Sequence, residues 1–442
     1  MTGTPPEKLV RSIGRWTLVG LLLNGILGSS VYRLSSEIGA TLGANAWWAW
    51  IGAAAAMGVL MLCFAEVASR FRDAGGPYLY ARIAFGAFAG VQMGWLAYLV
   101  RITASATNAN LFVIYLAEFI PAAGTPIGGA VTMALLFGGL AAINYRGVKQ
   151  GAAMSNFLIV AKVLPLVLFA VVGLVLVLER GPVEVAPVSS TVGNWIDVAL
   201  LLIFAYGGFE ASLVPLGEAK DPQRDAPFAL LTALAVCAAL YTACQLVVTM
   251  ALSDPGAHPR PLAEVGRILI GPAGAAFMAT GALLSLYGYF AASTINAPRL
   301  SYAMAERGDI PRVFAWVHPR FRTPAVSIIA YAVLSFGLAL SGTFIQNLTL
   351  SAVSRIATYG LVCLAVPVLR RREGRDPAVL PAQFRAPAGN LLAAIGTVFM
   401  LSLITRITAR EGVVLAVVIA GATTVWLLSR GRARTEAPPA VG

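Results

Sequence analysis

Twelve runs of apolar residues, each long enough to cross a lipid bilayer, follow one another along this chain of 442 residues. A helix needs about 20 apolar residues to span the hydrocarbon core, so the runs leave only short loops and tails between them. The sequence therefore predicts an all-α membrane protein with 12 transmembrane helices. Its spans are expected near residues 16–34, 45–67, 84–117, 126–144, 152–178, 194–216, 228–252, 268–298, 324–341, 344–369, 389–406 and 411–429.

Composition and charge agree with this prediction. Hydrophobic residues make up 58% of the chain and charged residues only 12%, about half the content of a soluble domain, which excludes an ordinary soluble enzyme. If the N-terminus is cytoplasmic, most of the 32 lysine and arginine residues fall in the cytoplasmic loops and tails, as the positive-inside rule requires. We therefore expect both termini in the cytoplasm. The net charge of +12 then reports orientation and does not indicate a nucleic acid partner, because the basic residues form no single patch.

Two of the spans contain residues that interrupt a helix. The first includes Asn24–Ser30 (NGILGSS) and the sixth includes Ala205–Glu210 (AYGGFE), and glycine and small polar residues favour helix poorly. Breaks five spans apart are typical of a transporter built from two inverted five-helix repeats, in which the unwound helix middles line the substrate site. The alternative, that these glycines only allow close helix packing, stays open.

A pair of broken helices suits a zwitterionic substrate. The N-terminus of a half-helix offers unpaired N–H groups and the positive end of the helix dipole to a carboxylate. The carbonyl groups freed at the other break can accept hydrogen bonds from an ammonium group. We therefore expect the backbone to recognise the common part of an amino acid.

Four motifs, found in the expected order, resemble the amino acid-polyamine-organocation (APC) superfamily of amino acid permeases. Residues 24–32 (NGILGSSVY) resemble its N-x-x-I-G-S-G-I-F stretch, and 70–80 (RFRDAGGPYLY) resemble R-F-P-x-A-G-G-x-Y-x-Y. Residues 204–227 are similar to F-A-[FY]-x-G-F-[DE] followed by E-x-K-N-P-x-R-x-x-P, and 299–311 (RLSYAMAERGDIP) to R-x-x-x-A-M-A-x-x-G-x-x-P. The resemblance covers nearly the whole chain and implies the LeuT-type fold, a five-plus-five inverted repeat with discontinuous helices 1 and 6.

The resemblance also implies a domain organisation and a function. A ten-helix transport core is expected over 16–369, a cytoplasmic loop over 370–388 and helices 11 and 12 over 389–429, with cytoplasmic tails at 1–15 and 430–442. The implied activity is secondary transport of L-amino acids across the plasma membrane by alternating access, without a cofactor. We expect proton-coupled symport of small or neutral amino acids. Exchange of one amino acid for another, a non-transporting sensor, and a monomer or homodimer stay open.

The resemblance assigns roles to particular positions. It implies that backbone N–H groups around Gly28, Ser29 and Ser30 bind the substrate carboxylate, although Ser30 stands where the family usually has glycine. Carbonyl groups at the two breaks would bind the ammonium group, and three aromatic residues occupy positions where the family places gates. The expected substrate-binding residues are Gly25, Ile26, Gly28, Ser29, Ser30, Arg101, Ser105, Phe204, Ala205, Tyr206, Gly207, Phe209, Glu210 and Tyr287, the gates being Tyr206, Phe209 and Tyr287.

Ionisable residues inside the spans are functional candidates, because an unpaired charge at mid-bilayer is costly. Lys162 matches a family lysine that takes the place of a sodium ion and ties the first and eighth helices together, so we expect it to carry the coupling proton or to act as a permanent strut. Glu210 is a second candidate for proton coupling. Arg101 is expected either to pair with Glu210 or to select an anionic side chain. Arg355 and Glu66 are expected to be structural, with Glu66 neutralised by nearby arginines.

An enzyme embedded in the membrane is the first rival class. The two histidines, His258 and His318, fall in loops on opposite sides of the membrane, and the sequence contains no H-E-x-x-H or G-x-S-x-G motif. We therefore expect neither a catalytic site nor a metal site. A channel or an amino acid sensor on the same fold is the second rival, and flux measurements separate both from a carrier.

Overall fold

The structure is a computed structural model that describes residues 14–28, 30–71, 76–147, 152–185, 187–213 and 219–435. Helices form nearly all of the regular structure in these ranges. They are α1 (Arg15–Ile26), α2 (Ser30–Leu42), α3 (Ala46–Ala68), α4 (Gly76–Phe85), α5 (Ala87–Leu116), α6 (Pro126–Tyr145), α7 (Ala152–Arg180), α8 (Val192–Tyr206), α9 (Phe209–Ser212), α10 (Pro222–Ala251), α11 (Pro261–Ile270), α12 (Pro272–Glu306), α13 (Ala325–Ser341), α14 (Phe344–Arg372), α15 (Gly389–Ile404) and α16 (Ala409–Thr435).

Each predicted span falls on a helix or on a pair of helices. The first span is divided into α1 and α2, and the sixth into α8 and α9. The third and eighth lie almost wholly on α5 and α12 but begin in the last residues of α4 and α11, and the other eight are single helices. In the described residues, nine helical segments are long and apolar enough to cross a membrane, and α13 and α15 are shorter apolar helices. The prediction of a helical membrane bundle with two discontinuous spans is therefore confirmed.

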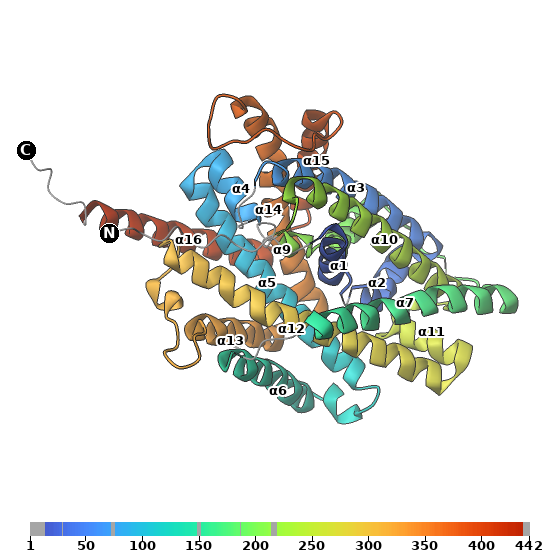
Figure 1. Ribbon diagram of the computed structural model, residues 1–442. Coiled ribbons are helices and arrows are strands. Elements are labelled where there is room, and N and C mark those ends of the chain that lie inside the picture. The colour runs from blue at the N-terminus through green and yellow to red at the C-terminus, as the bar shows by residue number, and fades with distance from the viewer. Residues whose placement is uncertain are drawn as a thin grey trace, which may run out of the picture.

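The discontinuous helices lie inside the bundle. Figure 1 shows α1 near the centre, with α6, α11 and α16 towards the outside. Helix α1 packs against α10, which also packs along α3, while α5 packs along α14 and α12. The outer helices carry exposed apolar side chains such as Ile127, Leu135 and Val417, as expected for surfaces that face lipid.

Capping residues determine where two of these helices begin. Thr191 and Asn194 form a capping box at the start of α8, and Thr343 and Gln346 form another at the start of α14. Each box satisfies backbone N–H groups that have no partner within the helix. Helix α8 ends at the second break, and helix α14 supplies the main charged neighbour of that break. Both helices are thus fixed at their N-terminal ends.

Ion pairs join the C-terminal end of α3 to that of α14. The buried Glu66 carboxylate lies 3.3 Å from Nη2 of Arg70 and 2.7 Å from Nη2 of Arg370, and it accepts a hydrogen bond from the Ala386 N–H at 3.0 Å. Arg70 also contacts Glu373 at 2.7 Å. The expected neutralisation of Glu66 by an arginine is confirmed for Arg70, while Arg72 lies outside the described residues.

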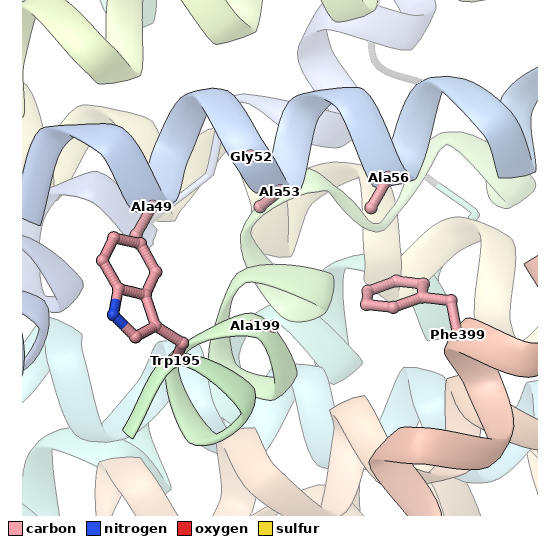
Figure 2. A pocket seen from close by; sticks show the side chains of 7 residues that line it. All are labelled: Ala49, Gly52, Ala53, Ala56, Trp195, Ala199 and Phe399. Carbon is pink, nitrogen blue, oxygen red and sulfur yellow. The ribbon is translucent and has the colours of Figure 1, made fainter. Parts of the chain in front are cut away.

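Two apolar pockets lie between helices. The first holds about 100 Å³ and is formed by α3, α8 and α15; Figure 2 shows Trp195 and Phe399 on one side of it and the small residues of α3 on the other. The second holds about 180 Å³ and lies between α7, α11 and α12. Neither shares a residue with the predicted substrate site.

Candidate functional site

The first break lies between Ile26, where α1 ends, and Ser30, where α2 begins. Side chains from three other helices bind the carbonyl groups around it. Lys162 of α7 donates to the Asn24 carbonyl at 3.2 Å, Tyr241 of α10 to the Ile26 carbonyl at 2.9 Å, and Ser285 of α12 to the Gly28 carbonyl at 3.4 Å. These donors take the place of the hydrogen bonds that a continuous helix would make. Ser29 lies outside the described residues.

The second break consists of Gly207 and Gly208, between α8 and α9. Gly208 has φ +104°, a conformation that an L-residue adopts only at a cost. A Cβ atom on Gly208 would lie 2.3 Å from the carbonyl oxygen of Gly25. The two breaks therefore meet backbone to backbone, and this contact requires glycine.

A side chain also connects the two breaks. The hydroxyl of Ser30, at the start of α2, donates to the carbonyl of Ala205 at 3.5 Å. Ser30 is buried. The serine that departs from the usual family glycine thus places a hydroxyl group between the N-terminus of one half-helix and the C-terminus of the other.

Glu210 lies at the centre of a buried polar cluster. Its carboxylate accepts hydrogen bonds from the Gly208 N–H at 2.8 Å and the Tyr359 hydroxyl at 2.9 Å, and it lies 3.3 Å from Nε of Arg355. The Arg355 guanidinium also lies over the ring of Phe204, 5.5 Å from its centroid. Since Arg355 and Tyr359 both belong to α14, this helix holds the second break in place.

The structure pairs Glu210 with Arg355 and not with Arg101, the partner that we had considered from the sequence. In the described residues Arg101 makes no ion pair and no hydrogen bond, although it is close enough for its charge to act on Glu210. The expectation that Arg355 is only structural is also incomplete, because its guanidinium reaches the break itself. The rotation of α5 and α14 about their axes decides this pairing, and sequence spacing does not specify that rotation.

Ser105 lies one helical turn beyond Arg101 and joins a cluster of hydroxyl groups. It hydrogen-bonds Tyr331 and lies 3.3 Å from the Ser293 hydroxyl and 3.5 Å from that of Tyr289. The cluster connects α5 to α12 and α13. Ser105 is therefore part of a polar region beside the breaks, but its hydroxyl is already hydrogen-bonded to protein.

Lys162 is buried, with 1% of its side chain surface exposed. Its hydrogen bond to Asn24 ties α7 to the last turn of α1, directly before the first break. No acidic residue pairs with it in the described parts of the chain, and no bond to α12, the eighth span, accompanies the one to α1. The structure thus contains one half of the link that the family resemblance implied.

The three aromatic residues expected to act as gates lie in different surroundings. Tyr206 is buried and donates to the Trp50 carbonyl at 3.0 Å, and Phe209 is packed between Phe64 and Tyr359. Tyr287, in contrast, is 40% exposed.

The periodicity of α12 explains where Tyr287 points. It follows Ser285, which binds the Gly28 carbonyl, by two residues, or about 200° around the helix axis. Tyr289 is four residues beyond Ser285 and therefore on its face. The structure places Tyr289 beside the site and Tyr287 on the opposite side of α12.

Several site residues were not found from the sequence. Tyr241, Ser285 and Tyr289 lie in continuous helices, and no local motif marks them. Asn24 was noted only as part of a motif, but its side-chain oxygen is buried and has no hydrogen-bond partner in the described residues. Only the position of Asn24 beside the break could have drawn attention to it.

Comparison with known proteins places the chain in a family. The family model described as "Amino acid permease" matches residues 13–428. The chain is 29% identical to a methylthioribose transporter of Bacillus subtilis over 86% of this chain and 85% of the relative. It is 26% identical to a branched-chain amino acid permease of Bacillus subtilis over 92% of this chain and 90% of the relative. It is 25% identical to a serine/threonine exchanger of the same species over 90% of this chain and 92% of the relative. The helical bundle with two discontinuous spans and the match over nearly the whole chain together show that this multi-pass membrane protein belongs to the amino acid permease family of transporters.

Proposed function

We propose that the protein carries L-amino acids across the plasma membrane by alternating access, with residues 16–369 as its transport core and both termini in the cytoplasm. The observation that carries this proposal is the backbone contact between the two breaks at Gly25 and Gly208. It joins the end of α1 to the start of α9, and the hydrogen bond from Ser30 to the Ala205 carbonyl brings the N-terminus of α2 close to the C-terminus of α8. A ligand held there meets N–H groups from one half-helix and carbonyl groups from the other.

The two ends of a zwitterion have distinct candidate partners. The first N–H groups of α2, which begins at Ser30, have no partner within the helix and suit a carboxylate. Carbonyl groups at the end of α8, including that of Ala205, and the unpartnered side-chain oxygen of Asn24 suit an ammonium group. The names of two relatives, a branched-chain amino acid permease and a serine/threonine exchanger, support a small or neutral side chain as the starting hypothesis.

We propose that Lys162 couples transport to protons. Its amine binds the backbone of the last turn of α1, directly before the break, so a change in its protonation alters the hydrogen bond that holds α1. Glu210 is the second candidate, but its carboxylate is engaged by three partners. Amino acid exchange is the alternative, supported by the name of the serine/threonine exchanger.

Uptake into proteoliposomes tests the carrier proposal. The purified protein should accumulate a labelled amino acid with saturable kinetics and show counterflow, and an acidic exterior should drive accumulation if protons are coupled. The amide of the same amino acid should fail to compete, because it lacks the carboxylate that α2 would bind. Binding without flux would identify a sensor, and competition by the amide would refute the assigned carboxylate site.

The role of Lys162 is tested by Lys162→Met, with Lys220→Met as a matched control. Lys220 is exposed, so its removal should change neither accumulation nor exchange. Lys162→Met should abolish accumulation driven by a pH gradient while leaving the binding of substrate measurable. Unchanged proton-driven accumulation in Lys162→Met would show that the coupling proton binds elsewhere.

A further inference from the structure

We infer that Arg101 selects a substrate with an acidic side chain. This inference rests on the proposed amino acid transport and replaces its small or neutral substrate with one that carries a second carboxylate. It comes from the charges around the breaks, which a neutral zwitterion leaves unbalanced.

Among the described residues around the breaks, positive side chains outnumber negative ones. Arg101, Arg355 and Lys162 are cationic side chains within the spans, while Glu210 supplies one carboxylate. Arg355 already pairs with that carboxylate at 3.3 Å. Arg101 has neither an ion pair nor a hydrogen bond in the part of the chain that the structure describes, so its guanidinium is free to bind an anion.

Arg101 lies directly beside the Glu210 cluster. The Ser351 hydroxyl donates to the carbonyl of Val100, the residue before Arg101, at 3.5 Å and accepts a hydrogen bond from Nη1 of Arg355 at 2.6 Å. A single serine therefore connects the α5 backbone at Val100, next to Arg101, to the guanidinium that reaches the second break.

A second contact on α5 points to the same region. Ser105 lies one turn beyond Arg101 and contacts the hydroxyl of Tyr289, which is close enough for the charge of Arg355 to act on it. The charge of Arg101 in turn acts on Glu210 and Tyr331. Arg101 and Arg355 thus flank the same polar region, and Arg101 is half-buried there and not fully enclosed.

Arg101 cannot satisfy its charge by reaching the membrane surface. It occupies the middle of α5, 14 residues after the helix begins at Ala87, which corresponds to about 21 Å at 1.5 Å per residue. A side chain that snorkels must lie near a helix end. The guanidinium therefore needs a partner inside the bundle, and the carboxylate of a substrate side chain matches its planar pair of donors.

The test uses two pairs of amino acids, and the members of each pair differ in charge but hardly in shape. Unlabelled L-glutamate and L-glutamine, and likewise L-aspartate and L-asparagine, are compared as competitors of labelled uptake into proteoliposomes. We expect the acid to compete at least tenfold better than its amide in the wild-type protein. Arg101→Gln should reduce this ratio to about one, and Arg101→Lys should keep part of it, because the charge remains but the paired donors are lost. Arg146→Gln, an exposed arginine outside the site, is the matched control and should leave the ratio unchanged.

Each outcome separates this inference from the broader proposal. Neutral amino acids could be transported while glutamate and aspartate compete no better than glutamine and asparagine. That result refutes the selection of an acidic side chain while amino acid transport stands. If no amino acid is transported or competes, the proposed function itself fails. If the wild type prefers the acids and Arg101→Gln keeps that preference, another residue selects the carboxylate and the role of Arg101 is refuted. The ratio in the wild-type protein decides the substrate class even if a variant fails to fold.

Discussion

Replacing Gly208 by alanine tests whether the two helix breaks touch. The alanine must adopt φ +104°, and its Cβ would lie 2.3 Å from the Gly25 carbonyl oxygen. A positive φ costs an L-residue about 1–2 kcal/mol. Forcing an extra carbon atom into a packed site costs about 1–3 kcal/mol more. We therefore expect Gly208→Ala to lower the free energy of unfolding by about 2–5 kcal/mol and to move α1 away from α9.

Two control variants separate the strain from the overlap. Gly181 also has a positive φ, +82°, but a Cβ there would meet nothing within 4 Å, so Gly181→Ala should cost only about 1–2 kcal/mol. Gly138 lies inside α6 with open space around it, and Gly138→Ala should be neutral or stabilise by about 0.5–1 kcal/mol.

Equilibrium unfolding in mixed detergent micelles compares the three variants, and uptake into proteoliposomes shows the functional effect. Gly208→Ala should be the least stable of the three and should lose most of its transport, whereas the other two should retain it. If Gly208→Ala is no less stable than Gly181→Ala, the backbones of the two breaks do not meet in the native protein.

Two further perturbations probe the ion pairs. Glu210→Gln and Arg355→Gln should each lower the free energy of unfolding by about 3–5 kcal/mol, because each leaves a buried charge unpaired. The double variant should lose less stability than the sum of the two single variants. Strict additivity in unfolding experiments would contradict the pairing. Burial opposes ionisation of Glu373, but hydrogen bonds from Arg70 and Arg385 outweigh it and hold its pKa below the usual 4.5. Its contribution to stability is therefore present above about pH 4.5 and is lost as the pH falls through the lowered pKa. Glu373→Gln should lower the melting temperature at neutral pH, and this effect should become smaller as the pH falls below about 4.5; an effect that does not change with pH down to acid unfolding would contradict this contribution.

The elements that the bilayer determines were predictable from the sequence. A span must be long, apolar and helical, so the runs of hydrophobic residues mark the helices directly. The two breaks were predictable because glycines such as Gly207 and Gly208 have low helix propensity and stand next to polar or acidic residues within an apolar span. The pair of Glu66 and Arg70 was also accessible, since only four positions separate the two residues at the end of α3.

Contacts between helices were less accessible. Whether Glu210 meets Arg101 or Arg355 depends on how two helices are rotated, and both arginines lie in spans that pack near the break. The side chains of Tyr287 and Tyr289 likewise point in directions that differ by about 200° around the axis of α12. A role carried over from the family with an uncertainty of two residues does not distinguish them. The role of Tyr241 depends on its distance from Ile26, a residue more than 200 positions away in the chain.

The hydroxyl groups at the breaks have a consequence for turnover. Ser30, Tyr241 and Ser285 already bind carbonyl groups at or beside the breaks. At these carbonyl groups an arriving ammonium group would replace an existing hydrogen bond, in contrast to the unpartnered side-chain oxygen of Asn24, and such an exchange yields only a small net gain. Modest affinity suits a carrier, because a substrate that is held weakly on one side of the membrane is released quickly on the other.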